Sequence, residues 1–162
     1  ARVVRKGVCY VPQTNNVFST LTVQENLEMG AYIREDNFKP RIQEIYEMFP
    51  PLAEKRKQRA GELSGGQRQM VAMGKALMVE PKILLLDEPT AGLSPIYRKE
   101  IFDTVRQINA TGIPILMVEQ NAKQSLAVAD RGYILVDGRN RTQGKGSDLL
   151  QDPEIAEMFL GG

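Results

Sequence analysis

Histidine is absent from this 162-residue chain, and cysteine occurs only once. Without histidine, the chain can form neither a histidine metal site nor a Ser-His or Cys-His catalytic pair. The single Cys9 cannot form a disulfide within the chain, which favours a reducing compartment. Neither sign of charge dominates, because 21 Lys and Arg residues accompany 20 Asp and Glu residues. Composition therefore gives no reason to expect nucleic acid as a partner.

No apolar run in the sequence approaches the length that spans a bilayer, so we expect no direct insertion into a membrane. The hydrophobic fraction of 42% is that of an ordinary globular domain with a core. The expected strands lie at 8–11, 83–86, 113–118 and 133–136, and the later strands alternate with expected helices at 95–109 and 121–129. This alternation indicates an α/β fold with a mainly parallel sheet.

Two local patterns refine this reading of the α/β part. The run Ile83–Leu86 is apolar without alternation, as expected of a strand buried on both faces of a parallel sheet. Asp137-Gly138 is a turn signal at the end of the fourth strand. The tail over 147–160 predicts two short helices broken at Pro153.

The stretch from about position 19 to 78 is largely helical and interrupts the alternation, so it indicates an inserted helical subdomain. Thr22 and Glu25 have the spacing of a capping box at the first of its helices. A second helix is expected from about Pro40 to Pro50-Pro51. The predicted domain thus spans 1–162, with 19–78 as the helical subdomain and with 1–18 and 79–162 as the α/β core and C-terminal tail.

The segment Ser64-Gly65-Gly66-Gln67 has the residues of a glycine-rich helix start. Ser64 fits the N-cap, and Gln67 stands where a capping-box partner would stand. Glycine lets an anion approach the backbone, and the free N–H groups of a helix start attract negative charge. This pattern is typical of a phosphate-binding device. The alternative reading is a well-capped helix with a flexible start.

Asp87 and Glu88 directly follow the apolar run Ile83–Leu86. In open α/β sheets, ligands bind beyond the carboxyl ends of the strands. Two carboxylates at that place suit a Mg²⁺ ion and a base that activates water. The alternative is that they cap the turn that follows, which contains Pro89, Gly92 and Pro95.

Two glutamines also follow predicted strands. Gln13 comes after the strand at 8–11 and Pro12, and Gln120 comes after the strand at 113–118. A neutral amide can ligate Mg²⁺ or hold a water molecule. Either glutamine alone could equally be a solvated surface residue.

Taken together, these motifs resemble those of ABC-type ATPases over nearly the whole chain. The likeness runs in order through a Q-loop at Val11-Pro12-Gln13, a signature at Leu63–Gln67, a Walker B motif at Ile83–Glu88 and a D-loop at Ala91–Pro95. The strings Glu88–Pro95 and Val118–Ala122, with the ending Phe159–Gly162, are similar to the LivF-type ATP-binding subunit of branched-chain amino-acid importers. The resemblance implies the core of a P-loop NTPase, with ATP and Mg²⁺ as cofactors.

The resemblance also implies roles for these positions. The implied nucleotide contacts are Ser64, Gly65, Gly66 and Gln67, the implied metal ligands are Gln13 and Asp87, and the implied catalytic residues are Glu88 and Gln120. The signature would contact ATP on a homologous ATPase subunit in a dimer. Transmembrane permease subunits would dock on the helical region. The implied location is cytoplasmic, peripheral to the inner face of the cell membrane.

Two departures from the family pattern qualify this interpretation. Most ABC ATPases carry a histidine where this chain has Gln120, although glutamine there resembles the LivF type. The chain also contains no G-x-x-x-x-G-K-S/T phosphate loop, the Walker A motif. We therefore interpret it as an ATPase truncated at its N-terminus that does not hydrolyse ATP alone. The alternatives are a soluble, non-transport ABC ATPase and a non-enzymatic module that offers its signature motif in trans.

Overall fold

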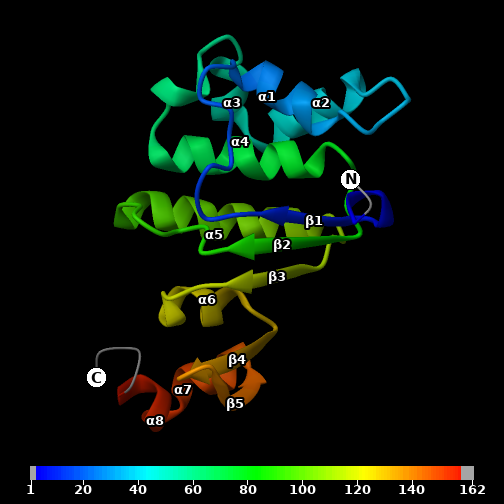
Figure 1. Ribbon diagram of the computed structural model, residues 1–162. Helices are drawn as coiled ribbons and strands as arrows, with labels where there is room; N and C mark the ends of the chain where they lie inside the picture. The colour runs from blue at the N-terminus through cyan, green and yellow to red at the C-terminus, as the bar shows by residue number, and fades with distance from the viewer. Residues whose placement is uncertain (1–2, 158–162) are drawn as a thin grey trace. The chain divides into compact units, whose positions relative to one another are not determined.

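The computed structural model describes residues 3–157, which form two compact units divided between Val118 and Glu119 (Figure 1). The first unit contains the 3₁₀ turns Val4–Lys6 and Ala60–Glu62, strands β1 (Val8–Val11), β2 (Ile83–Asp87) and β3 (Ile115–Val118), and helices α1 (Val23–Gly30), α2 (Lys39–Met48), α3 (Pro50–Glu54), α4 (Gly65–Leu77) and α5 (Pro95–Ala110). The second contains α6 (Ala122–Val128), β4 (Arg131–Val136), β5 (Arg139–Lys145), α7 (Gly146–Gln151) and α8 (Pro153–Ile155).

A three-stranded parallel sheet in the order β1-β2-β3 organises the first unit. The predicted α/β architecture with parallel pairing is therefore confirmed. Its central strand differs from the expectation of burial on both faces. Leu84 and Leu86 are buried on one face, whereas Ile83, Leu85 and Asp87 on the other are only half-buried.

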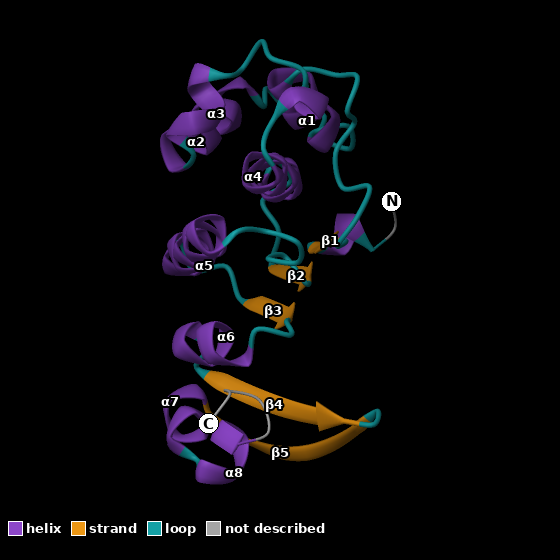
Figure 2. Ribbon diagram, turned by 90° about the vertical axis from the view of Figure 1, so that its left-hand side faces the viewer, coloured by secondary structure: helices purple, strands orange, loops and turns teal. Residues whose placement is uncertain are grey.

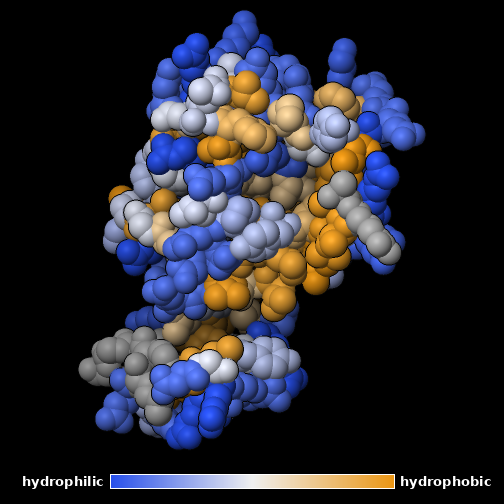
Figure 3. All heavy atoms as spheres, in the orientation of Figure 1, coloured by the Kyte–Doolittle hydropathy of each residue, from blue (hydrophilic) through white to orange (hydrophobic). Residues whose placement is uncertain are grey.

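Helix α5 packs on the buried face of the sheet. The core there includes Cys9, Val11, Leu84, Leu86, Ile101, Val105 and Ile108. Among the described residues of the first unit, Figure 2 shows no α-helix on the other side of the sheet, and the short ribbon beside β1 is the 3₁₀ turn Val4–Lys6. Tyr10, Leu116 and Val118 are 57%, 58% and 60% exposed on their strands. Figure 3 shows apolar atoms gathered over this part of the sheet.

Helix α1 begins as the sequence predicts. Thr22 and Glu25 form the complete capping box, in which the Thr22 hydroxyl accepts from the Glu25 backbone and the Glu25 carboxylate accepts from the Thr22 backbone. The next helix departs from the prediction, because α2 ends at Met48 and Pro50 opens the short helix α3. Proline lacks an N–H group and suits the first turn of a helix, so Pro50 begins α3 shortly after α2 has ended.

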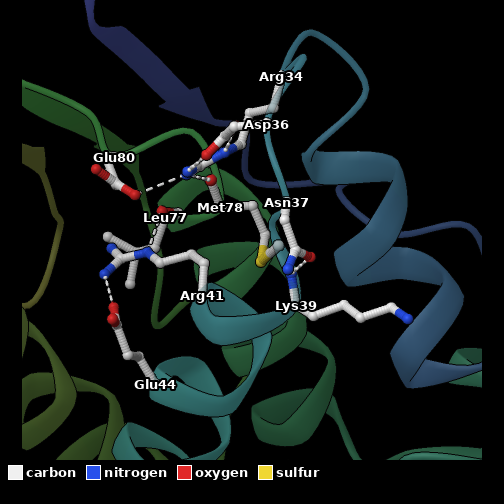
Figure 4. Close-up of polar contacts among 9 residues, drawn as sticks. All are labelled: Arg34, Asp36, Asn37, Lys39, Arg41, Glu44, Leu77, Met78 and Glu80. Atoms are coloured by element: carbon white, nitrogen blue, oxygen red, sulfur yellow. Dashed lines mark hydrogen bonds and ion pairs between the residues drawn. The ribbon is translucent and has the colours of Figure 1, made fainter.

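The end of α4 is held by two arginines from the helical region (Figure 4). Arg34 Nη1 donates to the Met78 carbonyl at 2.7 Å, and Arg41 Nε donates to the Leu77 carbonyl at 3.1 Å. Arg34 also pairs with Asp36 and Glu80. The last carbonyls of a helix have no partner within it, so these cations satisfy them and complement the negative end of the helix.

The second unit is built on the antiparallel hairpin β4–β5. Asp137 and Gly138 both have positive φ, of 50° and 73°, which is the conformation that the predicted turn requires. The sequence reading missed β5, because Arg139–Lys145 is polar. Leu126, Ile134, Leu149 and Ile155 form a small core. Helices α7 and α8 match the two predicted in the tail, with Pro153 in the first turn of α8, and the expectation beyond residue 157 lies outside the described residues.

Candidate functional site at the carboxyl edge of the sheet

The carboxyl ends of three parallel strands meet at one edge of the sheet in the first unit. Val11 pairs with Leu86, and Asp87 pairs with Val118. The loop after β1 carries Gln13, and β2 ends in Asp87 and then Glu88. Three of the predicted site residues are thus brought to the edge where α/β sheets bind ligands.

Gln13 and Glu88 contact each other directly. The Gln13 amide Nε2 donates to Glu88 Oε2 at 2.9 Å, although the two residues lie on different loops. Gln13 is exposed and Glu88 is half-buried. The contact is solvent-accessible and joins the loop after β1 to the turn after β2.

Glu88 has an unusual backbone conformation. Its φ is +44°, a left-handed value that costs a residue other than glycine about 1–3 kcal/mol. The Glu88 N–H donates to the Val118 carbonyl at 2.9 Å, and the Glu88 carbonyl accepts from the Ala91 N–H at 3.1 Å. These bonds fix the turn, which takes Glu88 out of the alternation of β2. Strain of this kind is often found at functional sites.

Asp87 has a partner that sequence reasoning missed. The Tyr10 hydroxyl donates to Asp87 Oδ2 at 2.7 Å. This hydrogen bond, with a smaller contribution from burial, raises the pKa of Tyr10 above its ordinary value. Tyr10 therefore remains a protonated donor at neutral pH. Alternation along β1 places Tyr10 on one face of the strand and Cys9 and Val11 on the other. Only the register between β1 and β2 brings Tyr10 to Asp87.

The signature residues lie at the start of α4, and the predicted capping box is present. Ser64 Oγ accepts from the Gln67 backbone N–H at 3.2 Å, and Gln67 Oε1 accepts from the Ser64 backbone N–H at 3.2 Å. Lys55 Nζ also donates to Gln67 Oε1 at 3.2 Å. The Gln67 side chain thus supports the helix start, while Ser64 and Gly65 are half-buried and can be reached by a ligand.

The two signature glycines also allow close packing. A Cβ atom at Gly66 would lie 2.8 Å from Tyr97 Cδ1, and one at Gly65 would lie 2.9 Å from Leu93 Cδ2. Gly66 is itself buried. The geometry therefore gives these glycines a packing role that is independent of any phosphate.

The loop after β1 is tied to α4 by Asn16. Its Nδ2 donates to Gln69 Oε1 at 2.7 Å, and its carbonyl accepts from Lys75 Nζ at 2.6 Å. Lys75 Nζ also lies 4.7 Å from the centre of the Phe18 ring. Neither polar contact has a sequence signal, since both depend on tertiary packing. They connect the segment that carries Gln13 to the helix that begins after Ser64.

Gln120 belongs to the second unit and lies just before α6. Its backbone carbonyl accepts from the Ala122 N–H at 2.9 Å. The neighbouring Asn121 caps α6, with its side chain accepting from the Gln124 N–H. Gln120 itself is exposed, so its side-chain amide is accessible within this unit.

The donor set at the sheet edge fits Mg²⁺ bound together with a nucleotide. Asp87, Glu88 and Gln13 offer only oxygen ligands, which this ion prefers. Within residues 3–157, no group of three or more His, Cys, Asp or Glu side chains is placed to hold a metal by itself. Mg²⁺ is commonly bound by one or two carboxylates, with phosphates and water completing its shell, so the arrangement suits a metal that arrives with ATP.

Comparison with known proteins agrees with the motifs. The model of the ABC transporter family matches residues 1–91. The branched-chain amino acid transport ATP-binding protein BraG of Pseudomonas aeruginosa is 45% identical over 161 residues, which are 99% of this chain and 69% of BraG. The probable branched-chain amino acid transport ATP-binding protein LivF of Archaeoglobus fulgidus is 42% identical over 96% of this chain and 66% of its own length.

A solved structure gives the same result for the fold. The ADP conformation of MJ1267, an ATP-binding cassette of an ABC transporter, superposes with a TM-score of 0.83 and 29% identity. The match covers 99% of this chain and 71% of that one. Among residues 3–157, no helix is both long and apolar enough to cross a membrane. The two relatives fit the predicted LivF type, and the chain belongs to the ABC transporter family of ATP-binding proteins.

Proposed function

We propose that this chain is the signature- and Walker B-bearing part of an ATP-hydrolysing subunit that powers branched-chain amino-acid import. The observation that carries the proposal is the hydrogen bond of 2.9 Å between Gln13 and Glu88, beside Asp87, at the carboxyl edge of a parallel sheet. The similarity to BraG and LivF, both named for branched-chain amino acid transport, supports the importer assignment.

Asp87 and Glu88 have separate tasks in this proposal. Asp87 is the carboxylate that holds Mg²⁺. Held there, the ion would supply positive charge that offsets the negative charge developing on the phosphate. Glu88 orients the attacking water and accepts its proton. The Gln13 amide competes for the Glu88 carboxylate, so movement of the loop after β1 controls when Glu88 can act.

Ser64, Gly65 and Gln120 act on the γ-phosphate, and Gly66 and Gln67 support the helix start. Ser64 and Gly65 at the start of α4 contact the ATP that is bound to a homologous subunit. The N-terminal end of α4 favours an anion there. Gly66 allows the close packing of this helix start, and Gln67 holds its cap. Gln120 donates a hydrogen bond from its amide, which cannot carry a proton at neutral pH.

This function defines the partners and location that we propose. The subunit works as a dimer with a homologous ATPase subunit. Permease subunits dock on the helical region, which contains α1 to α4. The assembly places the chain at the inner face of the cell membrane without inserting it.

ATP hydrolysis is the first test. The chain alone should neither bind ATP tightly nor hydrolyse it, because its sequence contains no phosphate loop. Fusion of a phosphate-loop segment from an ABC ATPase ahead of Ala1, here named the phosphate-loop fusion, should restore turnover. The matched control is the same fusion with the loop lysine replaced by alanine. Turnover equal to that control would contradict the ATPase assignment.

Transport is tested separately in Pseudomonas aeruginosa cells that lack BraG. The phosphate-loop fusion should restore uptake of radiolabelled leucine, and its Glu88→Gln variant should not. ATP hydrolysis without any uptake would favour a soluble, non-transport ATPase. Stimulation of another ABC ATPase by the unfused chain, with no turnover by the fusion, would favour an interaction module.

A further inference from the structure

Tyr10 lies where it can control the orientation of Asp87. The parallel register pairs Tyr10 on β1 with Leu85 on β2, and Asp87 is the next residue of β2 on the same face. The ring reaches along this face, and the hydroxyl donates to Asp87 Oδ2 at 2.7 Å. A hydrogen bond to an ionised acceptor is short and about twice as strong as one between neutral groups.

We propose that Tyr10 is a positioning residue that holds the Asp87 carboxylate in the orientation needed for Mg²⁺. With Oδ2 engaged by the hydroxyl, Oδ1 is the oxygen left to bind the ion. The inference rests on the proposed function, because it assigns a task toward the metal. It adds a residue from β1 to a site whose other carboxylate, Glu88, already depends on Gln13 from the following loop.

Burial among residues 3–157 does not explain the place of Tyr10. Its neighbours on β1, Cys9 and Val11, are 4% and 2% exposed and belong to the core, whereas Tyr10 is 57% exposed. A ring in that position gains little from burial, so the hydroxyl contact with Asp87 is its main specific interaction. Replacing Tyr10 by Phe therefore removes the contact while keeping the ring and the strand.

The two donors of β1 and its loop act on different carboxylates. Tyr10 holds Asp87, and Gln13 holds Glu88. Tyr10→Phe should therefore disturb Asp87 and leave the Gln13–Glu88 contact in place. This separation predicts a change in metal dependence without a matching change in nucleotide affinity. A general loss of structure would alter both.

The first experiment uses the 162-residue chain and measures the Asp87 side-chain rotamer from NMR three-bond couplings to Cγ. One rotamer should dominate in the wild-type chain, and Tyr10→Phe should give averaged couplings. Tyr32→Phe is the matched control, because Tyr32 is 83% exposed and its loss should change nothing at Asp87. A single, unchanged rotamer in folded Tyr10→Phe would overturn the proposal.

The second experiment measures the Mg²⁺ dependence of hydrolysis by the phosphate-loop fusion. Tyr10→Phe should raise the Mg²⁺ concentration for half-maximal turnover by about 10-fold or more, the scale seen when an outer partner of a metal ligand is removed. ATP affinity in EDTA should stay unchanged. A fall in turnover with unchanged Mg²⁺ dependence would overturn the proposal. An inactive parent fusion would contradict the proposed function instead, and the rotamer measurement would then decide the role of Tyr10.

Discussion

Asn26 should be among the residues on which the stability of the first unit depends most. Its side chain is 0% exposed at the third position after the start of α1. The Asn26 Oδ1 accepts from the Phe18 N–H at 2.8 Å. Its Nδ2 donates to the carbonyls of Phe18, Leu21 and Thr22 at 3.0, 3.3 and 2.9 Å. One buried amide therefore organises the turn that leads from the loop after β1 into α1.

The cost of Asn26→Ala can be worked out from these partners. The three carbonyls keep other donors, since they also accept from the backbone N–H groups of Leu21, Ala60 and Asn26. The Phe18 N–H loses the acceptor that Asn26 supplies, which costs about 1–3 kcal/mol. The lost volume adds about 1 kcal/mol, and the better helix propensity of alanine offsets about 0.5 kcal/mol. We expect a net loss of about 1.5–3.5 kcal/mol.

Guanidinium denaturation of the chain, followed by far-UV circular dichroism, measures this loss directly. Gln24→Ala is the matched control, because Gln24 lies on the same helix and its only described side-chain bond is to Glu28 at the surface. That variant should change the free energy of unfolding by less than about 0.5 kcal/mol. If Asn26→Ala were no more destabilising than Gln24→Ala, the reasoning from buried amide contacts would be refuted.

Three further predictions concern the start of α4 and Gln120. Ser64→Ala should lower the free energy of unfolding by about 1 kcal/mol, the usual value of an N-cap, and an unchanged denaturation midpoint would argue against the cap. Gly66→Ala should destabilise by about 1–2 kcal/mol through its contact with Tyr97, and adding Tyr97→Ala should reduce this cost, because it removes the two nearest ring atoms and leaves only Cβ at 3.2 Å. An equal effect in both backgrounds would contradict the packing role. In the phosphate-loop fusion, Gln120→Ala should slow hydrolysis less than Glu88→Gln does, because an amide gives only a hydrogen bond. The reverse ranking in steady-state turnover would make Gln120 the more important residue.

Local patterns allowed the helix starts to be predicted. The capping boxes at Thr22 and Ser64 each depend on residues three positions apart, so the sequence alone was sufficient to predict them. The grouping of Gln13 with Asp87 and Glu88 was also predictable, because parallel strands place their carboxyl ends at one edge. These features need no knowledge of tertiary packing.

Other features could not be predicted because they depend on register or on distant partners. The contact of Tyr10 with Asp87 requires the pairing of Tyr10 with Leu85, which no local pattern encodes. The ties from Asn16 to α4 join residues far apart in the chain. Strand β5 lacks an apolar face, and only its hairpin partner β4 makes it a strand. The beginning of α3 at Pro50 was hidden because proline can both end and begin a helix.

We propose above all that Glu88 acts as the base at the carboxyl edge of an ATP-hydrolysing subunit. Turnover of the phosphate-loop fusion and of its Glu88→Gln variant, measured as phosphate release, tests it most directly. Loss of a general base should slow hydrolysis by about 10²–10⁴-fold. ATP binding should persist, so that the ATP-bound dimer accumulates on size-exclusion chromatography. Unchanged turnover in the Glu88→Gln variant would contradict the account.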